Sequence, residues 1–139
     1  MNIDAMKREL IRDEGMQLKP YKCPAGKLTI GVGRNLEANG ITEREATIML
    51  EFDIEKFGYE LDRTIPWWRG LDEVRQRVIL NMAFNLGTAK LMEFQNTLAL
   101  VRAGKWAAAA DAMLQSKWAG QVGKRADRLA RMMRTGEVV

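Results

Sequence analysis

Apolar residues recur along the chain with two different periods, first that of a helix and then that of a strand. The opening residues show the helical period on one face: Ile3, Met6, Leu10 and Glu14. With Asn2 as the N-cap, they predict a helix over residues 3–14 that Gly15 ends. Because Glu14 continues an apolar face, we expect its carboxyl to be partly withdrawn from water and to suit a general acid. A helix-end glutamate that reaches solvent is the alternative.

A small β-hairpin is predicted to follow within residues 17–41, with a short third strand near residues 40–41. Its apolar positions alternate as in a strand: Leu28, Ile30 and Val32. This alternation puts Thr29 on the face opposite the apolar one. Residues 24–26 (Pro-Ala-Gly) predict the turn, because proline fixes φ and glycine relaxes it. A turn of this size brings Cys23 close to Thr29.

From Thr42 onward the patterns are helical. Thr42 and Glu45 form a capping box that opens a long helix over residues 42–63, which Pro66 ends. The inward face of this helix is expected to be Ala46, Leu50, Asp53, Phe57 and Leu61. Later helices are expected over residues 72–86, 94–103 and 105–116, the last of these burying Trp106, Ala110, Met113 and Leu114. The adjacent tryptophans at 67–68 favour packing against the helical part over stacking on a sugar.

Composition narrows the chemistry. The chain has 139 residues, long enough for a core without covalent cross-links, and a single cysteine, which excludes an internal disulfide. It has no histidine, which excludes a Ser-His-Asp triad, a Cys-His peptidase pair and an ordinary histidine zinc site. A glycosidase that works with carboxylates is compatible with this composition.

The charge is uneven along the chain. Residues 101–139 hold 8 Lys and Arg against 3 Asp and Glu, although the whole chain holds 22 against 18. The last helix carries a basic row at helical spacing, formed by Lys124, Arg128 and Arg131; a solvated face and a polyanion contact both remain open. No nucleic-acid motif accompanies the excess, so we expect no nucleic-acid partner. We also expect no signal peptide and no integral membrane segment.

One stretch combines an acid, a thiol and a hydroxyl at fixed spacing. Eight residues separate Glu14 from Cys23, and five separate Cys23 from Thr29. With the flanking Asp-Glu-Gly, Tyr-Lys and Thr-Ile-Gly-Val-Gly segments, this stretch closely resembles the active site of the phage-type lysozymes, the muramidase family of the T-even phages. The resemblance covers essentially the whole chain and includes the segments at 81–87, 116–118 and 125–126. The departure is Cys23, where the best-known member has aspartate.

The resemblance implies a predominantly α member of the α+β class with two lobes in a single domain. The small lobe with its antiparallel sheet would cover about 15–60, and the helical lobe about 61–139 together with the helix 3–14. The long helix would link the lobes as a hinge. Because the link between Gly33 and Gly40 is very short, we expect a trimmed small lobe.

The implied function is that of an endolysin that hydrolyses the β-1,4 bonds between N-acetylmuramic acid and N-acetylglucosamine in peptidoglycan. Glu14 would be the general acid, and Thr29 would help to hold the water. Cys23 would stand in for the second carboxylate, as a thiolate base, as a neutral water ligand or as a nucleophile. An ordinary thiol is only a few per cent ionised at neutral pH, and Glu14 nearby would make it less so.

The family pattern implies further site residues. The predicted substrate contacts are Leu36, Asn85, Lys117 and Arg125. Arg34, in place of the family's histidine, would form a structural ion pair with Asp53, and Asn81 would be a buried polar group.

The expected partner is peptidoglycan, with no metal and no cofactor. The protein would act as a monomer, made in the host cytoplasm and reaching the wall after a separate holin permeabilises the membrane. Two other functions stay open: a lytic transglycosylase, which would use a lone glutamate, and a non-catalytic peptidoglycan-binding module.

Overall fold

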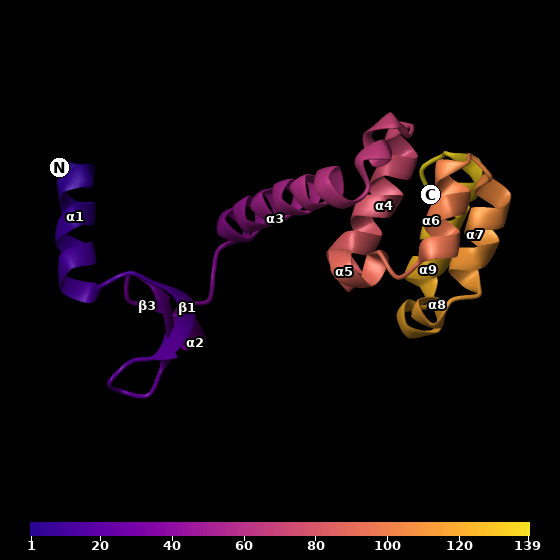
Figure 1. The fold of residues 1–139 in the computed structure, drawn as a ribbon. Helices are drawn as coiled ribbons and strands as arrows, with labels where there is room; N and C mark the ends of the chain where they lie inside the picture. The colour runs from indigo at the N-terminus through magenta and orange to yellow at the C-terminus, as the bar shows by residue number, and fades with distance from the viewer. The chain divides into compact units, whose positions relative to one another are not determined.

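The computed structural model describes all 139 residues and divides into two compact units, Met1–Met49 and Leu50–Val139 (Figure 1). One small antiparallel sheet accompanies helices in the rest of the chain, so the expected α+β, predominantly α class is confirmed. The boundary between the units falls inside the long helix α3 (Glu43–Thr64). The expected lobes, with helix 3–14 assigned to the helical lobe, stay a prediction. No helix combines the length and the apolar character that a membrane span requires.

Helix α1 (Ile3–Glu14) has the bounds that its periodicity predicts. The Asn2 side chain accepts a hydrogen bond from the backbone N–H of Ala5 at 2.9 Å, which satisfies one of the free donors at the helix start. At the other end Gly15 takes φ 77° and donates its N–H to the carbonyl of Ile11. Local capping chemistry therefore places Glu14 at the last helical position.

The sheet follows in the order β1 (Gln17–Lys22), β2 (Leu28–Gly31) and β3 (Arg34–Asn35), with both pairs antiparallel. The expected third strand near 40–41 is wrong. Gly33, at φ 68°, turns the chain back at once, so that β3 pairs with β2 directly. Asn35 then caps a single helical turn, α2 (Leu36–Asn39), by accepting from the N–H of Ala38.

The face of β2 that carries Thr29 is buried, although the side chain is polar. Thr29 is only 3 % exposed, whereas Leu28 is 37 % exposed. The burial of Thr29 is compatible with its polarity because its hydroxyl donates to the carbonyl of Lys27 at 2.8 Å. Helix α2 lies against β2, and its Glu37 accepts from the N–H of Leu28. The alternation of apolar residues in the sequence does not indicate the hydrogen bond from Thr29 to the carbonyl of Lys27.

Helix α3 begins with the predicted capping box. The N–H of Glu45 donates to the hydroxyl of Thr42 at 3.1 Å, and the N–H of Thr42 donates to the carboxylate of Glu45 at 3.0 Å. The helix ends before Pro66, which opens the 3-10 turn η1 (Pro66–Gly70). Of the expected inward face, Leu61 is buried and Phe57 packs against the core; Ala46, Leu50 and Asp53 are exposed. The last turns of α3 therefore anchor it in the second unit.

The second unit is helical and packs around one apolar core. Its further helices are α4 (Glu73–Leu86), α5 (Thr88–Leu91), α6 (Gln95–Arg102), α7 (Trp106–Leu114), α8 (Lys117–Val122) and α9 (Lys124–Thr135). Helix α7 contacts both α6 and α9, and α9 also contacts α4 (Figure 1). The largest fully buried side chains are Leu61, Ile65, Val78, Ile79, Met82, Leu91, Val101, Met113 and Met133. The sequence did not predict α5, and it assigned Leu114 to the core, where Ala109 lies instead.

The tryptophan pair packs as expected. Trp68 is 3 % exposed in the core, and Trp67 packs against that core. The indole N–H of Trp68 donates to Asp62 at 2.8 Å, and the Arg69 guanidinium covers its ring. The hydrogen bond from Arg69, followed by the one from Trp68, lowers the pKa of Asp62. These tryptophans are structural.

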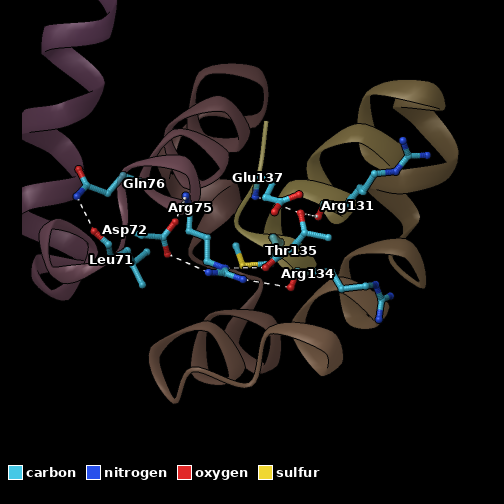
Figure 2. A network of polar contacts seen from close by, with 9 residues as sticks. Leu71, Asp72, Arg75, Gln76, Arg131, Arg134, Thr135 and Glu137 are labelled. Atoms are coloured by element: carbon cyan, nitrogen blue, oxygen red, sulfur yellow. Dashed lines mark hydrogen bonds and ion pairs between the residues drawn. The ribbon is translucent and has the colours of Figure 1, made fainter. Parts of the chain in front are cut away.

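A cation lies in the packing between α4 and the end of α9 (Figure 2). Arg75 is 9 % exposed; its guanidinium donates to the carbonyls of Met133 at 2.7 Å and Arg134 at 3.1 Å, and to Asp72 at 3.0 Å. It also lies 4.0 Å from the ring centroid of Trp106. Arg75 therefore satisfies carbonyls that the C-terminus of α9 would leave without partners.

Candidate functional site

Glu14 and the hairpin meet at Gly33. A carboxylate oxygen of Glu14 lies 2.8 Å from the position that a Cβ would take on Gly33. Two features therefore favour glycine at position 33. Its φ is 68°, and a side chain there would collide with the carboxylate of Glu14. The end of α1 and the β2–β3 turn together position the carboxyl of Glu14. The expected withdrawal of this carboxyl from water is wrong, because Glu14 is exposed and α1 has no buried residue.

Cys23 and Thr29 meet at the β1–β2 turn. The backbone N–H of Cys23 donates to the carbonyl of Lys27 at 3.0 Å, and that of Gly26 donates to the carbonyl of Cys23 at 2.7 Å. Thr29 pairs with Tyr21 across the two strands, which places its hydroxyl within reach of the thiol. The predicted proximity of Cys23 and Thr29 is therefore present in the structure.

The electrostatics of the turn favour the thiolate. The hydrogen bond from the backbone of Lys27 lowers the pKa of Cys23 most; partial desolvation opposes it, and the Ala25 backbone and Thr29 hydroxyl add to the lowering. The net direction is downward from the ordinary thiol value. The sequence predicts the opposite direction, because a nearby Glu14 would make the thiol less ionised. The direction differs because hydrogen-bond donors of the turn stabilise the thiolate, and Glu14 is not among the groups that shift the pKa of Cys23.

Arg34 has a partner that the sequence did not indicate. It forms an ion pair with Glu45, the glutamate of the capping box of α3. The pKa of Glu45 is lowered, first by the backbone N–H and hydroxyl of Thr42 and then by Arg34. The predicted pairing of Arg34 with Asp53 stays a prediction, since the two residues belong to different units. The capping-box position of Glu45 was the available signal, but it says nothing about a partner in β3.

A double-mutant cycle separates the two partners of Arg34. We expect Arg34→Met and Glu45→Gln to be non-additive in thermal melts, because each removes the same half-exposed ion pair. The effect of each is expected to be small, since solvent screens such a pair. The same cycle with Asp53→Asn tests the predicted pair. Additive effects in that second cycle would mean that Arg34 and Asp53 do not interact.

In the second unit, two asparagines one turn apart on α4 hold residues from later helices. Asn81 accepts from the guanidinium Nε of Arg125 at 2.9 Å. Asn85 accepts from the indole N–H of Trp118 at 2.8 Å. Because its oxygen is occupied, the exposed Asn85 keeps its NH₂ group for another partner. Trp118 is thus a positioning residue that sequence reasoning did not single out.

The other predicted substrate contacts are placed but not tested. Lys117 is the first residue of α8 and is exposed, and Leu36 is the first residue of α2 and is half-buried. Asn81 and Arg125 line a cavity of about 450 Å³ in the second unit, whose walls are mainly apolar. No group of three His, Cys, Asp or Glu side chains is arranged to hold a metal ion. The roles of Leu36, Asn85, Lys117 and Arg125 stay predictions.

Comparison with known proteins adds an independent line of evidence. The family model for phage lysozyme matches residues 12–135. The pre-baseplate central spike protein Gp5 of Enterobacteria phage T4 is 30% identical over 162 positions, which cover 96% of this chain and 28% of that protein. Probable T4-type lysozymes 1 and 2 of Dictyostelium discoideum are 29% and 27% identical, with 96% of each chain covered. Since these alignments are longer than the chain's 139 residues, the relatives contain residues that this chain lacks. The match over residues 12–135 contains Glu14, Cys23 and Thr29, and the chain belongs to the phage lysozyme family.

Proposed function

We propose that this protein is a lysozyme that hydrolyses the β-1,4 bond between N-acetylmuramic acid and N-acetylglucosamine in peptidoglycan. The observation that carries the proposal is the Glu14–Cys23–Thr29 pattern inside the family match, with all three residues in one helix–hairpin unit. The two probable T4-type lysozymes support it, because their similarity extends over 96% of both chains.

Each of the three residues has a distinct role in the proposed reaction. Glu14 donates a proton to the leaving glycosidic oxygen, which removes the need to expel an unstable alkoxide. Cys23 and Thr29, which are adjacent at the hairpin turn, hold the attacking water. This division between an acid and a separate water-holding group is that of an inverting glycosidase.

The lowered pKa of Cys23 favours the thiolate base among the three roles open to this residue. A thiolate can take the proton of the attacking water as it bonds to the anomeric carbon, while Glu14 gives its proton to the departing sugar. The water thus supplies one proton to Cys23 and its oxygen to the new reducing end. A neutral thiol could only orient the water, and a nucleophilic thiolate would form a thioglycosyl intermediate instead.

Product analysis tests the reaction class directly. Digestion of purified peptidoglycan is expected to yield N-acetylmuramic acid with a free reducing end, because water is the nucleophile. A 1,6-anhydro end would identify a lytic transglycosylase and refute hydrolysis. Binding to the walls without any product would identify a non-catalytic binding module.

The wider setting is part of the same proposal. The protein acts as a monomeric endolysin that passes from the host cytoplasm to the wall through a holin lesion. A virion-borne role is a second candidate, favoured by the similarity to a central spike protein. Immunoblots of purified virions distinguish the two, since a free endolysin is removed with the lysate.

Substitutions at Cys23 test its chemical role. Cys23→Ala is expected to lose roughly a hundredfold or more of kcat/KM, because neither a proton acceptor nor a water ligand remains. Cys23→Asp is expected to keep substantial activity, and Cys23→Ser, whose hydroxyl cannot ionise near neutrality, an intermediate level. Iodoacetamide should inactivate the unmodified enzyme and spare Cys23→Asp. Normal lysis by Cys23→Ala or by the alkylated enzyme would show that Cys23 has no role in catalysis.

The pH dependence of the activity also tests whether Cys23 accepts a proton. Because the pKa of Cys23 is lowered, its thiolate persists to more acidic pH than an ordinary thiolate. Activity should therefore fall as pH decreases through that lowered pKa. In Cys23→Asp the acidic limb should move further down, toward the carboxyl range near roughly 4. An unmoved acidic limb would contradict a proton-accepting role for Cys23.

A further inference from the structure

The outer face of α9 carries a row of cations that the proposed catalysis does not use. Lys124, Arg128 and Arg131 lie four and three residues apart and share one helix face. The buried residues of this helix are Ala126, Leu129, Ala130 and Met133. At about 100° per residue, the centre of the cationic row lies roughly 180° from the centre of the buried face. The row therefore points away from the packing of its own unit.

No acidic side chain forms an ion pair with this row, although Asp127 lies beside it, three residues after Lys124 and four before Arg131. Lys124, Arg128 and Arg131 are all exposed, and none is in an ion pair. The next cation along the helix, Arg134, differs because it is bound to Asp111 at 2.5 Å. Figure 2 shows the side chain of Arg131 extended away from the Arg75 network. The face thus keeps a net positive charge, three cations against Asp127, that is available to an external partner.

The row also opposes the stability of its own helix. Lys124 and Arg128 are like charges four residues apart, which repel each other. Lys124 lies in the first turn, where the helix dipole disfavours a cation. A bound anion would relieve both effects.

We propose that the α9 row binds a linear, phosphate-bearing polymer of the bacterial cell wall, of the poly(glycerol phosphate) type, and so retains the enzyme on its insoluble substrate. The inference rests on the proposed function for its biological setting. The three cations span about 10 Å along the helix, which suits successive charges of an extended polymer better than one enclosed ligand. Two of them are arginines, whose planar forks match phosphate oxygens.

The composition of the helix disfavours a single-stranded nucleic acid as the occupant. Such binding combines cations with aromatic side chains on which bases stack. Helix α9 contains no aromatic residue, from Lys124 to Thr135. Duplex nucleic acid, which needs no stacking, is kept as an outcome of the test.

Binding is measured with the full chain carrying Glu14→Gln, so that walls are not digested. The row variant combines Lys124→Gln, Arg128→Gln and Arg131→Gln. The control variant removes three other exposed, unpaired cations of the same unit by Lys90→Gln, Arg102→Gln and Lys105→Gln. The probe is fluorescent poly(glycerol phosphate), titrated at several salt concentrations.

The row variant is expected to bind at least tenfold more weakly near 0.1 M salt, while the control stays within about twofold. The slope of log K against log salt should fall by roughly 2, because three flexible-chain phosphates contribute about 0.7 each. An equal loss in both variants, or retained binding by the row variant, would overturn the proposal. Tighter binding to duplex DNA of equal phosphate number, lost with the row, would overturn it in favour of nucleic acid.

Two further measurements keep the conclusion independent of folding and of catalysis. Thermal melts should show the row variant at least as stable as its parent, because the substitutions remove the repulsion within the row. Should it unfold, Arg128→Glu alone serves as the variant. With Glu14 restored, the row variant should hydrolyse short soluble glycan fragments normally and polymer-bearing walls more slowly. Row-dependent binding by a protein that hydrolyses nothing would refute the proposed function and leave the α9 row supported. Equal hydrolysis of such walls by parent and row variant would refute retention by the row.

Discussion

Glu14→Gln is expected to lower the rate of peptidoglycan hydrolysis by a factor of about 10² to 10⁴, the range over which a positioned general acid contributes. The amide keeps the shape of the side chain against Gly33 but cannot donate the proton that the leaving oxygen requires. The measurement is the initial rate of release of reducing ends from purified peptidoglycan. Thermal melts of the same protein should match the parent, because the change is isosteric.

Glu9→Gln is the matched control for this substitution. Glu9 is an exposed glutamate on the same helix, five residues earlier, and is not part of the proposed site. Its replacement removes the same charge from α1 and should leave the rate unchanged. Retention of more than a tenth of the activity in Glu14→Gln would sink the assignment of Glu14 as the acid.

Arg75→Met is expected to destabilise the second unit by roughly 3 kcal/mol. It leaves the carbonyls of Met133 and Arg134 without their donor and removes the guanidinium partner of Asp72, which keeps only its backbone hydrogen bond. Urea unfolding at neutral pH measures the loss. Arg77→Met is the control on the same helix. It removes an exposed pair with Glu73 and should cost roughly 0.5 kcal/mol or less.

Gly136→Ala probes the same contact from the other side. Gly136 has φ 71°, and an added Cβ would lie 2.7 Å from a guanidinium nitrogen of Arg75. Part of the cost of Gly136→Ala should therefore disappear in the Arg75→Met background, while the backbone strain remains. Fully additive effects of the two substitutions would show that Arg75 does not hold the end of α9.

Signals that act within a few residues predicted the local structure well. Asn2 caps α1 because its side chain reaches a backbone N–H three residues on. The Thr42–Glu45 box opens α3 for the same reason, with both partners inside one turn. The spacing of Glu14, Cys23 and Thr29 identified the candidate site, because a helix end and one hairpin turn are enough to position these residues.

Interactions between residues far apart in the sequence could not be predicted from these local signals. The guanidinium of Arg75 donates to carbonyls 58 and 59 residues away. Every residue has a backbone carbonyl, so the residue types do not indicate which ones accept this hydrogen bond. The alternation in β2 suggested that Thr29 faces away from the apolar side, yet an internal hydrogen bond lets it be buried. The third strand was misplaced because the positive φ of Gly33 turned the chain seven residues before the expected position.

The sequence by itself determined the capped starts of α1 and α3, the hairpin, the family pattern and the identity of the three candidate catalytic groups, because each depends on residues within one or two turns of the chain. Only the tertiary structure decided the environment of these groups. The donors around Cys23 set the direction of its pKa, and the ion pair of Arg34 with Glu45 joins β3 to the start of α3. Hydrogen-bond geometry and burial arise when separate elements meet, and a one-dimensional pattern does not contain those distances.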